Sequence, residues 1–183
     1  MAFKRDIEER LTAWKNSDGR KPLIIRGARQ VGKTTLVKDF ASVYKYTIFL
    51  NLEKPADRRF FEDFNDVHTI MEALLLAHGI PSEDMEHTLL FIDEIQESPK
   101  TIQLLRYFYE ELPRLHVISA GSLLEFALHR VQSFPVGRVE FLYLHPLSFP
   151  EYLKAIAKPQ WREALQQLPL NPAAHTVLME AFH

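Results

Sequence analysis

The residues best suited to chemistry lie in one short segment near the amino end, Gly27-Ala28-Arg29-Gln30-Val31-Gly32-Lys33-Thr34. It fits G-x-x-x-x-G-K-[ST], the spacing of a loop whose backbone N–H groups surround phosphate oxygens. In such a loop the lysine reaches the β and γ phosphates, and the Thr34 hydroxyl can ligate Mg²⁺. The segment, together with Thr35, therefore predicts a nucleotide site that uses magnesium.

Two carboxylates follow a later apolar run. Residues 88–92 predict a strand that is covered on both faces, and this strand leads directly into Asp93 and Glu94. Asp93 would hold Mg²⁺ beside Thr34, mostly through water, and Glu94 would polarise the water that attacks the γ-phosphate. The alternative is a pair of solvated carboxylates at a strand end. Their position after the phosphate loop favours the hydrolytic interpretation.

Three further polar residues are expected at the same edge of the sheet, because ligands of open parallel sheets bind beyond the carboxyl ends of the strands. Asn51 ends the predicted strand 47–51 and could hydrogen-bond Glu94. Ser119 ends the predicted strand 117–119 and could orient the attacking water, with Ser122 as a rival candidate. For each residue the alternative is a polar group that terminates a strand or caps a helix.

Arg138 stands between Gly137 and a predicted strand at 139–144. A guanidinium delivered to the γ-phosphate stabilises the charge that develops during phosphoryl transfer, and arginine does this better than an ammonium. The alternative is an ion pair with a surface carboxylate. The sequence leaves both interpretations open.

The elements that must position these residues follow from hydrophobic periodicity. Strands are predicted at 23–26, 47–51, 88–92, 117–119 and 139–144, and helices at 4–16, 33–44, 67–78, 102–112 and 123–129. Residues 58–61 mix arginine and phenylalanine, which favours an amphipathic helix over a nucleic-acid contact. Strands that alternate with helices predict an α/β protein with a mostly parallel sheet between two helical layers.

Composition narrows the class of protein. The chain has 183 residues, of which 46% are apolar and 25% charged, and its net charge is −2, so no global field attracts nucleic acid. It has no cysteine, which excludes disulfides and zinc–thiolate sites. The sequence lacks a signal peptide and any apolar run long enough to cross a bilayer, so we expect a cytoplasmic protein without a membrane partner.

Taken together, the chain resembles the AAA+ ATPases, and more narrowly the prokaryotic AAA-domain ATPases that carry an uncharacterised C-terminal domain. The resemblance spans about residues 5 to 155. The segments that carry it are GARQVGKTT (27–35), LFIDEIQ (90–96), SAGS (119–122), GRV (137–139) and LHPLSFPEYL (144–153).

The resemblance implies a three-layer P-loop NTPase fold with a five-stranded sheet in the order 5-1-4-3-2, and ATP with Mg²⁺ as the ligands. It also implies that Ser119 takes the first sensor position and that Asn51 opposes Glu94. Arg138 would match an arginine finger that acts within the chain or on a neighbouring subunit, through self-association or with a protein partner.

The resemblance divides the chain at residue 150, with residues 1–150 as the nucleotide-binding core. Residues 151–183 would be the start of a helical lid or linker, expected to be truncated because such proteins continue further. The predicted activity is ATP hydrolysis that drives or regulates a partner. A non-hydrolysing nucleotide switch, a P-loop kinase for a small molecule and a nucleic-acid-stimulated motor are the alternatives.

Overall fold

The structure is a computed structural model, which describes residues 5–122, 134–155, 173, 175 and 176. The predicted helix at 123–129 lies outside the described residues, and so does most of the predicted lid or linker at 151–183. Among the described residues, no helix combines the length and the apolar character that a membrane span requires.

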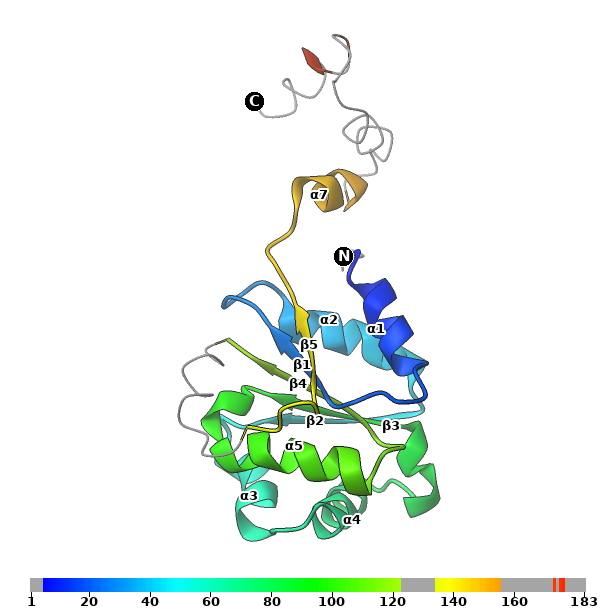
Figure 1. Cartoon of the computed structure of the whole chain (residues 1–183), viewed down its shortest axis with the longest axis vertical. Helices are drawn as coiled ribbons and strands as arrows, with labels where there is room; N and C mark the ends of the chain where they lie inside the picture. Colours follow the sequence, from blue (N-terminus) through cyan, green and yellow to red (C-terminus); the bar gives the residue numbers. More distant parts are fainter. Residues whose placement is uncertain (1–4, 123–133, 156–172, 174, 177–183) are drawn as a thin grey trace. The chain divides into compact units, whose positions relative to one another are not determined.

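A five-stranded sheet forms the centre of the residues between Ile7 and His145 (Figure 1). Its strands are β1 (Leu23–Arg26), β2 (Tyr46–Asn51), β3 (Thr88–Asp93), β4 (His116–Gly121) and β5 (Glu140–Tyr143). The spatial order is β2-β3-β4-β1-β5, and each neighbouring pair is parallel. The predicted order 5-1-4-3-2 and the predicted three-layer α/β fold are therefore confirmed.

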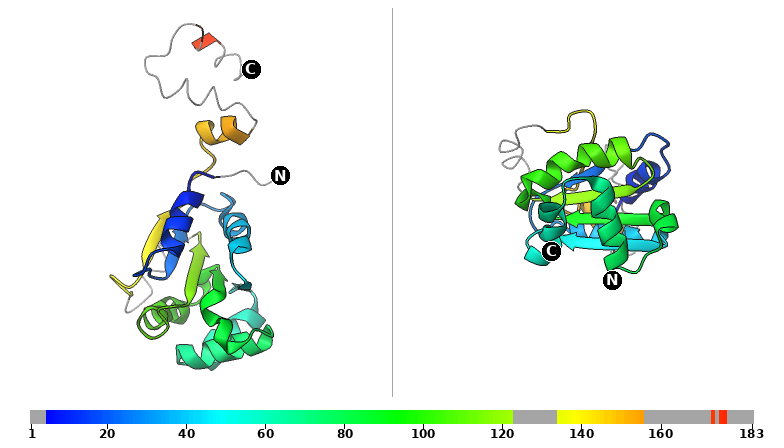
Figure 2. Two further views of the ribbon diagram at one scale, coloured as in Figure 1. Left: turned by 90° about the vertical axis from the view of Figure 1, so that its right-hand side faces the viewer. Right: turned by 90° about the horizontal axis from the view of Figure 1, so that it is seen from below.

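Helices cover both faces of this sheet (Figures 1 and 2). One face carries α1 (Glu8–Lys15) and α2 (Lys33–Phe40). The short helix η1 (Ala41–Val43) directly follows α2. The other face carries α3 (Pro55–Asp63), α4 (Val67–Ala77) and α5 (Pro99–Glu111). The remaining short helices are η2 (Ser82–His87) and η3 (Ile95–Glu97).

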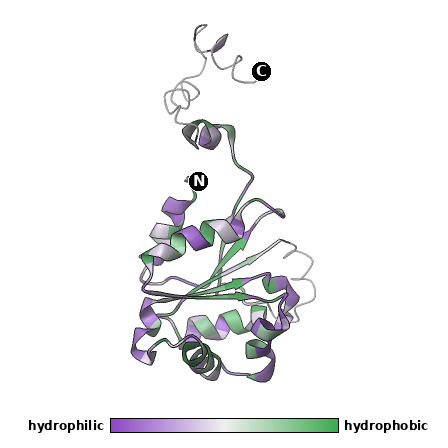
Figure 3. Ribbon diagram, turned by 180° about the vertical axis from the view of Figure 1, so that it is seen from behind, coloured by the Kyte–Doolittle hydropathy of each residue, from purple (hydrophilic) through white to green (hydrophobic). Residues whose placement is uncertain are grey.

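Alternation along the strands produces two separate hydrophobic cores. Leu23 and Ile25 of β1 pack on the side of α1 and α2, whereas Ile24 packs on the side of α3 to α5. All six residues of β3 are buried, as a strand covered on both faces requires. Figure 3 shows the strands as mostly hydrophobic and the helices as mixed, so the helices turn one apolar stripe inward.

Helix boundaries depend on local capping groups. The side chain of Asp66 accepts from the amide of Thr69 at the start of α4, and Ser98 accepts from the amide of Thr101 at the start of α5. Helix α3 begins with Pro55 at its first turn, where a missing N–H costs nothing. The two side-chain caps satisfy free amides at the first turns of α4 and α5, and the buried residues of both helices pack against the sheet.

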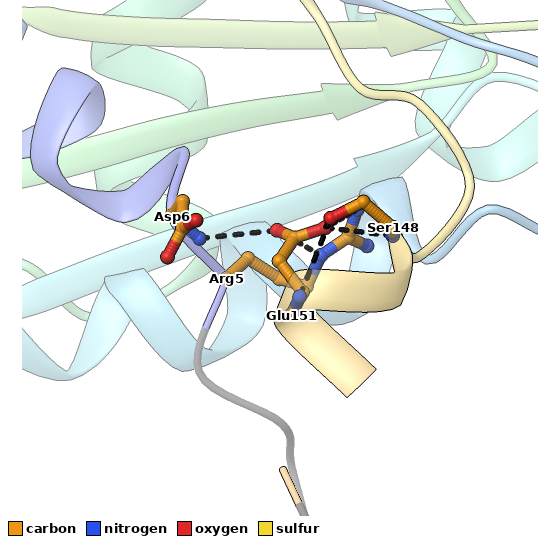
Figure 4. A network of polar contacts seen from close by, with 4 residues as sticks. All are labelled: Arg5, Asp6, Ser148 and Glu151. Atoms are coloured by element: carbon orange, nitrogen blue, oxygen red, sulfur yellow. Dashed lines mark hydrogen bonds and ion pairs between the residues drawn. The ribbon is translucent and has the colours of Figure 1, made fainter. Parts of the chain in front are cut away.

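The two ends of the described chain form a second compact unit, with residues 5 and 6 beside the segment from Pro146 onward. Its centre is the carboxylate of Glu151 in α7 (Phe149–Ala155). This carboxylate accepts hydrogen bonds from Arg5, from the amide of Asp6, and from the amide and hydroxyl of Ser148 (Figure 4). That residues 151–183 begin a lid or linker stays a prediction.

Candidate nucleotide site

The phosphate loop occupies residues 27–32, between the end of β1 and the start of α2. Gly32 precedes α2 with φ of 92°, a value that side chains with a Cβ rarely adopt. Gly27 is needed for a different reason: a Cβ there would overlap the carbonyl oxygen of Leu144. The amide of Leu144 in turn donates to the carbonyl of Arg26 at 2.7 Å. The loop therefore starts in close contact with the residue that follows β5.

Lys33 is the first residue of α2, and only 7% of it is exposed. Its ammonium donates to the carbonyls of Gly27 at 3.0 Å and Ala28 at 2.8 Å, so it spans the inside of the loop. Burial lowers the pKa of Lys33, while the nearby charges of Glu94 and Asp93 partly offset that effect. A buried ammonium inside a ring of backbone groups is suited to anionic phosphate oxygens.

Thr34 and Asp93 connect the loop to the centre of the sheet. The hydroxyl of Thr34 donates to Oδ2 of Asp93 at 2.7 Å, and the amide of Glu94 donates to Oδ1 at 3.1 Å. A hydroxyl and a carboxylate are oxygen ligands of the kind that Mg²⁺ prefers, and Mg²⁺ is bound by one or two such groups plus substrate phosphates. The pair therefore fits magnesium, and Thr34 and Asp93 are the residues that would hold it.

Glu94 follows β3 in an unusual backbone conformation. Its φ of 52° and ψ of 45° place it in the left-handed region, which is rare for a residue with a side chain. Its Oε2 accepts a hydrogen bond from the side-chain amide of Gln96. The turn brings Glu94 to the wall of a cavity of about 490 Å³ that the phosphate loop also lines.

This cavity gathers several of the predicted site residues. Its wall comes from three places: the loop and the start of α2, the turn after β2, and the carboxyl ends of β3 and β4. The lining residues are Arg29, Gln30, Gly32, Lys33, Thr34, Thr35, Glu53, Glu94 and Ser122. Cation, hydroxyl and carboxylate therefore share one cavity, beside the buried Asp93.

Asn51 ends β2, level with Asp93 of β3, as its place in the sequence suggests. Its side chain, however, has a local partner: Oδ1 accepts from the amide of Glu53 at 2.9 Å. Its own amide donates to Asp57 at 2.8 Å. In this structure Asn51 closes the turn that presents Glu53 to the cavity, while Glu94 is hydrogen-bonded to Gln96.

Strand β4 is longer than predicted, which changes the place of Ser119. It continues through Ala120 to Gly121, because these residues pair with Ile25 and Arg26 of β1. Ser119 is consequently inside the strand, fully buried, and its hydroxyl donates to the carbonyl of Leu23 at 3.4 Å. The prediction that Ser119 ends the strand is wrong.

Ser122 is the residue that follows β4 and lines the cavity. Its Oγ is buried and has no hydrogen-bond partner among the described residues. A buried hydroxyl without a partner beside the phosphate loop is available to a ligand or an ordered water.

Arg138 lies away from this cavity. It precedes β5, whose first residue Glu140 is level with Leu23 at the amino end of β1, whereas the phosphate loop follows the carboxyl end of β1. Arg138 donates to Glu110 of α5 at 2.8 Å and lines a separate cavity of about 370 Å³ with Arg106 and Val136. The surface ion pair considered from the sequence is therefore present, and the structure does not bring Arg138 to the loop of its own chain.

Sequence reasoning gave no role to two residues at the site, Glu53 and Gln96. Glu53 lies in the turn after β2, and the signal for it is the spacing of Asn51 and Glu53, which suits a side chain that caps an amide two residues ahead. Gln96 is part of the segment that carries the resemblance, but no pattern of residue types indicated its contact with Glu94.

Comparison with known proteins agrees with this geometry. A search of curated proteins finds no match. The family model described as "AAA domain" matches residues 19–153, which include the phosphate loop, all five strands and the segment that leads into α7. This chain therefore belongs to the AAA domain family of P-loop ATPases.

Proposed function

We propose that this chain is a magnesium-dependent ATP hydrolase whose turnover drives or regulates a protein partner. The observation that supports this most is the joint placement of Lys33, Thr34 and Glu94 on one cavity. Thr34 also donates to the buried Asp93, so a metal ligand and a candidate base lie on consecutive residues, 93 and 94. A site that only holds phosphate needs the loop and the metal ligand, but not the second carboxylate.

In the proposed reaction the backbone amides of the loop bind the phosphate oxygens, and Lys33 exchanges its contacts with the carbonyls of Gly27 and Ala28 for the β and γ phosphates. Thr34 and Asp93 would hold magnesium, which would supply positive charge to the phosphates. Glu94 accepts a hydrogen bond and then a proton from the attacking water, whose oxygen forms the new bond to the γ phosphorus. The bond to the β-phosphate oxygen breaks, its electron pair stays on that oxygen, and ADP is the leaving group.

The test compares steady-state phosphate release from Mg-ATP by the wild type and by Glu94→Gln. Loss of a general base lowers the rate by about 10² to 10⁴-fold, and ATP affinity should stay within about twofold because Glu94 does not bind the phosphates. Equal rates would end the hydrolase proposal. Nucleotide binding without turnover in the wild type would favour the switch, and phosphate transfer to an acceptor would favour the kinase.

Arg138 is proposed to act on the nucleotide of a neighbouring copy. The observation that supports this role is that Arg138 lies at the amino ends of the strands, whereas the phosphate loop of its own chain lies at their carboxyl ends. The exposed guanidinium is held by Glu110, a contact that a neighbouring phosphate can replace. The adenine preference and the neighbouring copy both rest on the family.

A mixing experiment tests this proposal. Arg138→Ala and Glu94→Gln are each expected to lose turnover alone. In a mixture, a copy with an intact Glu94 can receive Arg138 from its neighbour, so phosphate release should rise above the sum of the two separate samples. As the control, Arg138→Ala is mixed with a chain that carries both Lys33→Ala and Arg138→Ala. That second chain cannot supply the arginine. A mixture that stays at the sum contradicts action between copies.

A further inference from the structure

Gln96 makes a contact with Glu94 that the proposed function does not yet use. Its side-chain Nε2 donates to Oε2 of Glu94 at 2.5 Å. Gln96 does not belong to the lining of the nucleotide cavity, so it can reach the chemistry only through Glu94. Its own Oε1 is buried and has no hydrogen-bond partner among the described residues. Within the described part of the chain, the one hydrogen bond of this half-buried side-chain amide thus goes to the candidate base.

The backbone around this contact is closely held. After Glu94 the chain enters η3, in which the amide of Glu97 donates to the carbonyl of Glu94 at 3.0 Å. Ile95 is fully buried in the core beneath α4 and α5. The turn is therefore anchored between β3 and the capped start of α5, and it sets the side chains of residues 94 and 96 against each other.

The left-handed conformation of Glu94 is strained for a residue with a side chain, and the surrounding structure must offset that strain. The turn that imposes this strain aims the carboxylate at the cavity and places the Gln96 donor on one of its oxygens. A carboxylate that is fixed by one oxygen keeps the other free to receive a water proton. The geometry thus resembles a base with its orienting group, rather than a solvated pair.

The orientation of the amide supports the same conclusion. An amide group has a donor end and an acceptor end, and the hydrogen-bond network decides which one faces a partner. The opposite orientation would place Oε1 of Gln96 against a carboxylate oxygen of Glu94, which is repulsive. A carboxylate at position 94 therefore selects the orientation in which Gln96 donates.

We propose that Gln96 is a positioning residue that holds the carboxylate of Glu94 toward the attacking water. This inference rests on the proposed hydrolysis and adds to it the residue that orients the base. The resemblance gives a contact with Glu94 to Asn51, which would hold the carboxylate away from water. In this structure the contact with Glu94 is made by Gln96, whereas the side chain of Asn51 is bound to the amide of Glu53.

The test is a double-mutant cycle on ATP turnover with Gln96→Met and Glu94→Gln. Methionine keeps the length and volume of glutamine but has no donor. We expect Gln96→Met to lower kcat at least about tenfold, because a misplaced group loses much of its effect, while KM and ADP affinity stay within about twofold. In the Glu94→Gln background the same substitution should have no further effect, since Gln96 acts through Glu94.

Other outcomes have distinct meanings. An unchanged or higher kcat in Gln96→Met, or an equal loss in both backgrounds, overturns the positioning role while the proposed function stands. A wild type that turns over no faster than Glu94→Gln removes the proposed function, and with it the catalytic role of Gln96. Asn51→Ala is the matched comparison, and a larger loss of kcat there than in Gln96→Met would assign the orienting role to Asn51 instead.

A second readout needs no substitution at position 96. The side-chain NH₂ signals of Gln96 in a ¹⁵N-labelled, nucleotide-free sample should shift in Glu94→Ala and stay unchanged in Glu53→Ala. If the Gln96 signals do not shift in Glu94→Ala, the contact between Gln96 and Glu94 is not formed. That result would overturn the inference, whatever the turnover of the variants.

Discussion

The hydroxyl of Thr34 lies 2.7 Å from Oδ2 of Asp93, and this hydrogen bond joins the first turn of α2 to the end of β3. The two groups belong to elements on different parts of the chain, and Asp93 is buried at the edge where the strands end. The bond holds a hydroxyl and a carboxylate, two oxygen groups that suit Mg²⁺, beside the phosphate loop. A nucleotide site is thereby organised before its ligands enter.

Asp93→Asn keeps the size of the side chain but removes its charge. We expect the Mg²⁺ concentration for half-maximal turnover to rise at least about tenfold, because carboxylate oxygens are preferred by Mg²⁺ over neutral amides. Nucleotide affinity without magnesium should not fall. Titration of turnover with MgCl₂ measures this. Thr34→Ser retains the hydroxyl and serves as the control, and equal magnesium requirements in wild type and Asp93→Asn would contradict the assignment.

Lys33→Ala should remove most of the nucleotide affinity. The buried ammonium supplies charge-assisted hydrogen bonds worth about 1.5–3 kcal/mol each, so a loss of about 100-fold is expected in calorimetric titration with ATP. Lys38→Ala, an exposed position in the same helix, should bind normally. Affinity that survives in Lys33→Ala would place the nucleotide elsewhere.

Substitution of the loop glycines by alanine should destabilise the protein for two different reasons. In Gly27→Ala the new methyl group meets the carbonyl of Leu144, at an expected cost of about 1–3 kcal/mol. In Gly32→Ala there is space, but a φ of 92° is strained, at an expected cost of about 1–2 kcal/mol. Each kcal/mol lowers Tm by about 2–4 °C, which calorimetry detects. Gly19→Ala, in open space without a positive φ, should leave Tm unchanged.

His116 gives a prediction for the pH dependence of stability. It begins β4, is 8% exposed, and packs edge-on against Tyr44 and Trp14 at 5.0 and 5.9 Å between ring centres. Burial, then the charge of Arg20, lower its pKa from 6.5 to about 4. The folded state therefore binds fewer protons than the unfolded state between these values.

Stability should consequently be level above about pH 6.5 and fall as the pH drops toward 4, by at most about 1.4 kcal/mol per pH unit. Urea unfolding at pH 7, 6 and 5 measures this slope. His116→Phe keeps an aromatic ring and should flatten the difference between pH 7 and 5. A variant with the same slope as the wild type would show that other groups are responsible.

Glu151 also has a lowered pKa in the folded state, but here the cause is stabilisation of the charged form rather than burial. Burial alone would raise its pKa, but the hydrogen bonds from Arg5, Ser148 and Asp6 outweigh burial and lower the pKa from 4.5 to about 2. The ionised carboxylate therefore stabilises the second compact unit at any pH above about 4.5, and this contribution to stability disappears as the pH falls through 2.

Glu151→Gln should therefore loosen the second unit at neutral pH. Hydrogen exchange at the amides of Asp6 and Ser148, which both donate to this carboxylate, should become faster. Exchange in β3, at the centre of the other unit, should not change. Glu9→Gln, an exposed position in α1, is the control. Unaltered exchange at both amides would contradict the role of the carboxylate.

The sequence alone predicted the fold and the phosphate loop, because both depend on patterns within short segments. The loop is fixed by glycine spacing, and the parallel sheet follows from strands alternating with amphipathic helices. β1 has the predicted bounds, and β3 extends one residue further, to Asp93. The placement of Asp93 and Glu94 at the edge of the sheet needed no knowledge of distant contacts.

The surroundings of Glu94 could not be predicted in the same way. Ser119 is inside its strand because Gly121 pairs with Arg26, a residue nearly a hundred positions away. Asn51 turns back to Glu53 since a short side chain can bond an amide two residues ahead. The Gln96 contact depends on the left-handed turn at Glu94, which residue types do not reveal. Long-range pairing and local turn geometry, rather than composition, decide these positions.

The parallel alignment of β1 and β5 has a kinetic consequence. The phosphate loop lies at the carboxyl ends of the strands and Arg138 at their amino ends. Under the proposed mechanism, an isolated molecule therefore has both the loop and the arginine but cannot bring them to the same nucleotide. Specific activity then ceases to be a constant: it grows with the amount of enzyme in the assay and fades on dilution. The local abundance of this chain would itself set the pace of hydrolysis.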